Sequence, residues 1–182
     1  AESLLVLLPN NNVGLSVGSA INLAAILSGG PFLGASTGII GFLFRVNNVP
    51  GMGYMHLFNT PYFVTIYNVS QAAIMTSLMG ILYINTGGVV GQFYILQTIL
   101  VLFIGSLINT LIISGLISIR ESQKFTILWM ENIKGTFLGA SAVGTLGIII
   151  FLAFVSYGYG AVILFFGPLL LARHSFKLYI DM

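Results

Sequence analysis

The sequence predicts an all-α integral membrane protein, and composition, hydropathy and charge placement together support that fold class. Of the 182 residues, 57% are hydrophobic and only 5% are charged, and the mean hydropathy is +1.04. A soluble domain carries roughly 25% charged residues. This small number of charges cannot solvate the surface of a water-soluble fold of this size. The apolar surface must therefore face lipid.

Apolar stretches separated by short breaks define about six expected transmembrane helices, in a single membrane domain that covers the whole chain. A bilayer requires about 17–25 residues for each helix, so the shorter stretches predict tilted or half-length helices. Gly29, Gly30 and Pro31 break the first pair, because Pro lacks an amide donor and Gly costs backbone entropy. The expected helices are 13–28, 31–44, 63–84, 89–119, 136–157 and 159–172.

The two ends of the chain are expected to differ in structure. Residues 1–12 form a lead-in that we expect to be the end of an earlier helix. Residues 173–182 turn polar within a few positions, which is typical of a helix that leaves the membrane toward a cytoplasmic domain outside this chain.

All six cations fall on one side of the membrane when the six expected crossings are drawn. The loops on the other side carry no charge. This is the positive-inside pattern, which predicts that both ends of the chain are cytoplasmic. Chance sorting of so few charges is the alternative. The cations are Arg45, Arg120, Lys124, Lys134, Arg173 and Lys177.

The segment 120–135 separates two expected helices on the cationic side. Its part 125–134 is amphipathic and contains Trp129, the only Trp of the chain. Trp favours the headgroup level, where its ring is buried and its N–H stays wet. The segment therefore predicts a short helix that lies in the plane of the interface.

Two short motifs recur and suggest an inverted repeat of three helices each. Gly18–Asn22 resembles Gly105–Asn109, and residues 31–36 resemble residues 136–141. The halves would be 13–88 and 89–172, with the interfacial segment inserted in the second. Inverted repeats of this kind build transporter-like folds with a site near the midplane. Coincidence in a chain of few residue types is equally open.

Uncharged amides are the candidate ligand-binding groups inside the membrane. No Asp, Glu, Lys or Arg lies in the middle of an expected helix, which argues against an ion-coupled pump or a proton relay. A buried amide must find a helix partner, water or a ligand. Bonding between helices is the simpler interpretation, and a ligand site is the alternative. The candidates are Asn22, Asn68, Gln71, Gln97 and Asn109.

Several kinds of chemistry are excluded or lack support. There is no Cys, so disulfides and thiol catalysis are excluded. His56 and His174 have no second ligand at metal spacing, and phosphate loops and Ser/His/Asp arrangements are absent. We therefore expect no catalytic residue, metal or cofactor in these residues. A net charge of +2 gives no support for nucleic acid.

Two sets of motifs resemble the N-terminal membrane sensor domain of bacterial HD-GYP proteins, especially those of clostridia and related Firmicutes. The resemblance covers nearly the whole chain, and it is specific as a sum of motifs. The first set is residues 4–10 and 16–17, the Gly-Gly-Pro break and His56–Pro61. The second is 143–147, 156–161 and 166–179.

The resemblance implies a function in signal transduction. In that family the last helix continues into a cytoplasmic metal-dependent phosphodiesterase that acts on cyclic di-GMP. The His and Asp residues that bind the metal in that domain are not in this sequence, so no catalytic residue of the family can be assigned here. The resemblance implies a bacterial cytoplasmic membrane protein, but it does not imply a ligand. The partners that we expect are the lipid bilayer and an unidentified small or lipophilic ligand. We expect the full-length protein to be a homodimer.

Three hypotheses remain open on function. The leading one is a sensor or anchor module whose last helix moves, with Gly160, Gly167 and Pro168 as a hinge, because Pro removes one helical hydrogen bond. The second is a small transporter-like, substrate-binding protein, which the proposed repeat favours. The third is a structural subunit of a larger membrane complex.

Overall fold

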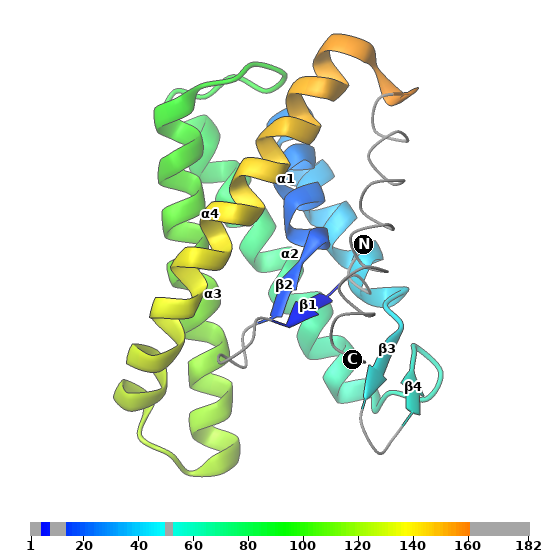
Figure 1. Ribbon diagram of the computed structural model, residues 1–182, viewed down its shortest axis with the longest axis vertical. Helices are drawn as coiled ribbons and strands as arrows, with labels where there is room; N and C mark the ends of the chain where they lie inside the picture. Colours follow the sequence, from blue (N-terminus) through cyan, green and yellow to red (C-terminus); the bar gives the residue numbers. More distant parts are fainter. Residues whose placement is uncertain (1–4, 8–13, 50–52, 161–182) are drawn as a thin grey trace, which may run out of the picture.

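The computed structural model describes residues 5–7, 14–49 and 53–160, which form a helical bundle with two short β-hairpins (Figure 1). This confirms the expected helical class. The helices of the described part are α1 (Val17–Leu43), α2 (Tyr62–Asn85), α3 (Ile95–Glu121) and α4 (Phe125–Tyr157). The strands β1 (Leu5–Leu7) and β2 (Gly14–Ser16) pair antiparallel, as do β3 (Asn47–Val49) and β4 (Gly53–Met55).

The strand β1 corrects the expectation that the lead-in is the end of a helix. Leu5 pairs with Ser16 and Leu7 pairs with Gly14, just ahead of α1. In the sequence this short apolar run is followed by Pro9 and three Asn residues, which favour turns over a continuing helix. The first helix therefore begins only at Val17, four residues later than expected.

The helix α1 folds back on itself at Gly30, as the Gly-Gly-Pro break predicts. Gly30 has φ 73° and ψ −164°, which are not helical angles. The two arms, 17–29 and 31–43, run side by side (Figure 1), and a Cβ on Gly34 would overlap the Ile26 side chain. Pro31 has no amide for the Leu27 carbonyl, which instead accepts a hydrogen bond from the Gly91 N–H at 2.8 Å. The break is thus satisfied by the loop after α2.

The helices α2, α3 and α4 run up, down and up beside this folded helix (Figure 1). The α2–α3 loop turns at the upper end with positive φ at Gly87 and Gly91, and α3 ends at the lower end on left-handed Ser122. The most extensive packing is between α1 and α2. A folded first helix and three long ones therefore surround one interior.

The segment 125–134 is not a separate interfacial helix, because it forms the first turns of α4. That helix continues to Tyr157 without a break, since no Pro interrupts it. Trp129 stacks on Phe125 with ring centroids 6.4 Å apart. Its indole N–H is buried and finds no hydrogen-bond acceptor among the described residues. The expectation that this N–H faces water is therefore also wrong.

The hydrophobic core lies between the first arm of α1 and the upper parts of the other helices. Its small and apolar side chains come from every helix, which holds the bundle together as one unit. The buried members are Ala20, Leu23, Ala24, Ile26, Leu27, Met79, Tyr83, Val101, Ile150 and Phe151.

Three helices of the described part are long and apolar enough to cross a membrane, which suggests a membrane protein. They are α1, α3 and residues Ala140–Tyr157 of α4. The expectation of six is thus not supported. Length and composition qualify α1 as a whole, but its fold at Gly30 leaves two arms that are each shorter than a bilayer requires. The amides of Asn68 and Gln71 make α2 less apolar, and residues 161–172 lie outside the description.

The inverted repeat is also not supported. Its first unit opens with a helix that folds back at Gly30, whereas α3 and α4 of the second unit are long and uninterrupted. The recurring motif at 31–36 starts at Pro31, and its counterpart starts at Thr136 inside α4. One Pro decides the difference, because it removes the amide that would continue the helix.

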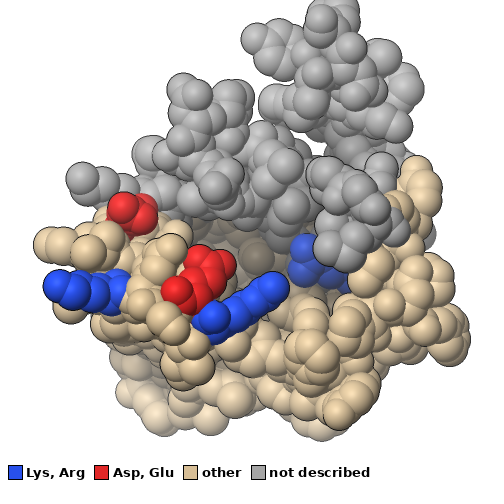
Figure 2. All heavy atoms as spheres, turned by 90° about the horizontal axis from the view of Figure 1, so that it is seen from below, with Lys and Arg blue, Asp and Glu red and all other residues tan. Residues whose placement is uncertain are grey.

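Described Lys, Arg, Asp and Glu side chains lie at the lower end of the bundle (Figure 2). These side chains are Arg45, Arg120, Glu121, Lys124 and Glu131. The turns at the upper end, around Gly30, Gly87 and Gly158, carry no charge. Arg173 and Lys177 lie outside the described residues. For the part of the chain that is described, the charge asymmetry agrees with the expected positive-inside pattern.

Candidate functional site

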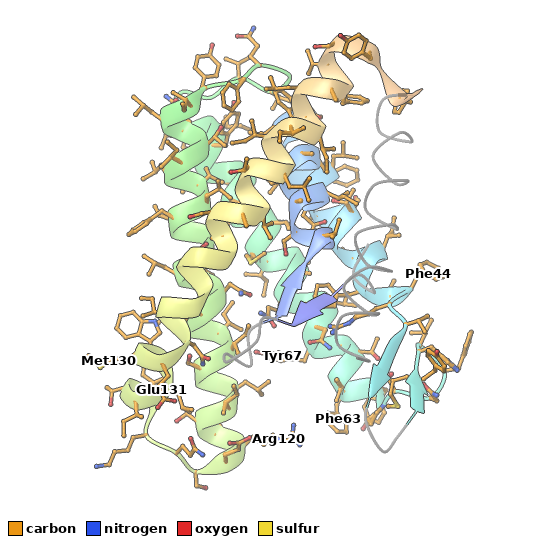
Figure 3. All side chains as sticks on the ribbon, viewed as in Figure 1. Phe44, Phe63, Tyr67, Arg120, Met130 and Glu131 are labelled. Atoms are coloured by element: carbon orange, nitrogen blue, oxygen red, sulfur yellow. The ribbon has the colours of Figure 1, made fainter. Side chains whose placement is uncertain are left out.

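A hydrogen bond between α2 and α3 brings together two of the predicted amides. Gln71 donates from Nε2 to Asn109 Oδ1 at 2.8 Å, across 38 residues of sequence. One turn below, the Tyr67 hydroxyl donates to the Ile112 carbonyl at 3.2 Å. Figure 3 shows Tyr67 reaching from α2 toward α3. These bonds fix the relative height of the two helices in the lower half of the bundle.

The helix α4 joins α3 by a similar polar contact. Asn132 Nδ2 donates to the Ser114 hydroxyl at 3.2 Å, and Ser114 is fully buried. The two helices can lie close together here because the inner face of α3 has the small residues Ser114 and Thr110 instead of large apolar side chains. We call Tyr67, Gln71, Asn109, Ser114 and Asn132 the polar cluster.

Gln97 is not part of the polar cluster. It lies near the upper end and donates from Nε2 to the Thr86 carbonyl at 3.2 Å. The Tyr83 hydroxyl donates to the Gln92 carbonyl at 2.6 Å in the same region. Both bonds attach the α2–α3 loop to its helices.

The remaining predicted residues do not take part in the Gln71–Asn109 bond. Asn22 is on the first arm of α1 and is only 5% exposed. Asn68 is half-buried on α2. Of the hinge residues, Gly160 is exposed with open space where a Cβ would stand, while Gly167 and Pro168 lie outside the described residues.

Three members of the polar cluster, Tyr67, Ser114 and Asn132, are not among the predicted amides. Tyr67 precedes Gln71 by one helical turn, so its membership in the same face was available from spacing. Asn132 was assigned to an interfacial helix and not to the bundle. No sequence pattern marks Ser114 as a contact between helices, because a hydroxyl in a helix bonds its own backbone as readily as a neighbouring helix.

The polar cluster is uncharged, which limits the chemistry it can perform. It offers amide and hydroxyl groups for hydrogen bonding, and no carboxylate or imidazole for proton transfer. Among the described residues, no three His, Asp or Glu side chains are placed to hold a metal ion. His56 lies in the α1–α2 loop, where its Nδ1 accepts from the Phe58 N–H at 3.3 Å, and His174 lies outside the description.

Comparison of the chain with protein-family models, curated proteins and solved structures finds no match.

Proposed function

We propose that the chain is a multi-pass sensor or anchor module of the bacterial cytoplasmic membrane, which regulates a cytoplasmic HD-GYP phosphodiesterase joined to its C-terminal side. The observation that carries the regulatory part is the polar cluster. Its uncharged groups bond α2 to α3 near the middle of the bundle and α3 to α4 closer to the charged end. The HD-GYP output rests on the motif resemblance alone.

Bonds of this strength suit a two-state module. A side-chain hydrogen bond between membrane helices is worth about 0.6 kcal/mol and at most about 1.7 kcal/mol. A ligand or lipid that engages one of these amides competes with the helix contact. It then shifts the population of helix arrangements by its difference in affinity for the two states.

The proposed orientation predicts opposite labelling of two exposed turn residues. The chain has no Cys, so Gln92→Cys in the upper loop and Gln123→Cys in the lower turn each carry the only thiol. In intact cells, a membrane-impermeant maleimide is expected to label Gln92→Cys alone, because the cationic end stays in the cytoplasm. Gln123→Cys is expected to react after permeabilisation. The reverse pattern would contradict the orientation.

The regulatory role predicts that breaking the α2–α3 bond changes the output of the full-length protein. Loss of about 0.6 kcal/mol shifts a two-state equilibrium about threefold. Gln71→Leu and Asn109→Leu are therefore each expected to change basal cyclic di-GMP hydrolysis in proteoliposomes by about that factor, and in the same direction. The double variant is expected to add little, since both variants remove one bond.

Leu96→Ala is the matched control, because Leu96 is 75% exposed on α3 and is expected to face lipid. Its hydrolysis should equal that of the unaltered protein. Unchanged hydrolysis in both amide variants would contradict the regulatory role. A coding sequence that continues past Met182 without an HD-GYP domain would contradict the proposed output.

The folded helix α1 favours one rival, a transporter-like substrate-binding protein. Discontinuous helices with Gly and Pro at the break surround the sites of many transporters. In the described part, Gly30 and Pro31 form such a break and the buried Asn22 lies on the adjoining arm. Concentrative uptake of a substrate into proteoliposomes by the 182-residue chain alone would favour this rival.

A further inference from the structure

The loop between α1 and α2 exposes an unusual number of aromatic rings. We define the aromatic loop as residues 44–63, excluding 50–52, which lie outside the description. Phe58 is 91% exposed, and the other rings of the group are all more than half exposed. Figure 3 shows Phe44 pointing outward from the lower part of α1 and Phe63 at the start of α2. The exposed rings are Phe44, Tyr54, Phe58, Tyr62 and Phe63.

Hydrogen bonds to Asn59 and His56 hold the tip of the aromatic loop in one shape. The Asn59 side chain accepts from the His56 N–H at 2.6 Å and donates to the Tyr54 carbonyl at 2.8 Å. The N–H groups of Asn59 and Thr60 donate to the His56 carbonyl. The rings of His56 and Phe58 meet edge to face with centroids 6.1 Å apart. The exposed ring of Phe58 is thus presented by an ordered turn.

The aromatic loop lies at the cationic end of the bundle, where an aromatic belt is expected. Tyr and Trp concentrate at the membrane–water interface of membrane proteins. On α4, Phe125 and Trp129 stack near the same end. Exposed Ile40 lies one helical turn before Phe44, and exposed Ile66 lies one turn after Tyr62, so the apolar surfaces of α1 and α2 are expected to continue into the rings of the loop.

The low charge of the aromatic loop favours lipid over a protein partner, and its unpaired strand edges limit how deeply it can enter the membrane. The stretch 44–63 has no Asp or Glu, and its one cation, Arg45, lies over the Phe42 ring at 5.6 Å. A protein partner would find almost no charge to recognise here. Within the described part of the chain, β3 and β4 pair only with each other, so their outer edges need water. Such edges are excluded from the hydrocarbon region.

We propose that the aromatic loop is a lipid-binding element that inserts into the headgroup region of the leaflet at the charged end of the bundle, with Phe58 at the boundary of the acyl chains. It anchors the α1–α2 connection in the membrane surface. The element does not depend on the proposed sensor role.

The test places a single Trp at the tip and measures its depth. In a Trp129→Phe background, the Phe58→Trp variant of the chain is reconstituted into phosphatidylcholine vesicles. Lipids with a nitroxide near the headgroup are expected to quench Trp fluorescence several-fold more than lipids with a nitroxide near the chain end. Aqueous acrylamide is expected to quench it weakly. The substitution is mild, because the side chain is exposed and aromatic.

Gln123→Trp in the same background is the matched control, since Gln123 is an exposed polar residue in the α3–α4 turn at the same end. Acrylamide is expected to quench it strongly and lipid nitroxides weakly. Equal acrylamide quenching at the two positions would overturn the proposal, as would strongest quenching of the Phe58→Trp variant by the deep nitroxide. Native-like helical circular dichroism of both variants confirms that they are folded.

Discussion

Gly80→Ala is expected to lower the free energy of unfolding by roughly 1–3 kcal/mol, the cost of overpacking a tight interior. A Cβ on Gly80 would stand 2.5 Å from Pro31 Cα and 2.7 Å from Pro31 N. These are backbone atoms at the fold of α1, so they cannot rotate away as a side chain can. The loss is measured by denaturant unfolding in mild detergent.

Gly115→Ala is the matched control for Gly80→Ala. Gly115 lies in α3, and a Cβ there would meet open space, with no atom of the described residues within 4 Å. Both substitutions gain about 1 kcal/mol of helix propensity, and the difference between them isolates the contact with Pro31. Gly115→Ala is therefore expected to be neutral or stabilising. Equal stability of the two variants would contradict the close approach of α1 and α2.

Gly30→Ala is expected to cost roughly 1–3 kcal/mol for a different reason, which is backbone strain. The angles φ 73° and ψ −164° fall in a region that is essentially restricted to Gly. A Cβ there would also lie 3.3 Å from Val90 Cγ2. Relief of the strain would move the arms of α1 apart and disturb the bond from Gly91 to the Leu27 carbonyl. Unfolding in the same detergent measures the cost.

Gly91→Ala separates the general cost of a positive φ from the cost of this particular fold. Gly91 has φ 84°, yet it is exposed and a Cβ would meet nothing within 4 Å. Its N–H is retained in the variant, so the bond to Leu27 stays possible. We expect a smaller loss of stability than for Gly30→Ala. A loss as large as that of Gly30→Ala would show that the fold of α1 adds no strain of its own.

Of the amides that the sequence offers as candidates, Gln71 and Asn109 meet the simpler expectation, which is a hydrogen bond between helices. Composition required every buried amide to have a partner, and Gln71 and Asn109 do bond each other. Sequence spacing could not identify the pair, because a bond across 38 residues depends on which faces of α2 and α3 meet. Gln97 belongs to the loop instead, since α3 begins only at Ile95 and places it at the upper end.

Three features could be predicted from the sequence alone: the helical class, the break at Gly30–Pro31 and the position of the described charges at one end of the bundle. Each follows from local chemistry: apolar content, a missing amide and the cost of charge in lipid. Two other features became clear from the structure: the break folds α1 into two short arms, and residues 125–134 form the first turns of α4. Those outcomes depend on long-range contacts, such as the bond from Gly91 to Leu27 and the packing of Gly80 on Pro31, which no local pattern encodes.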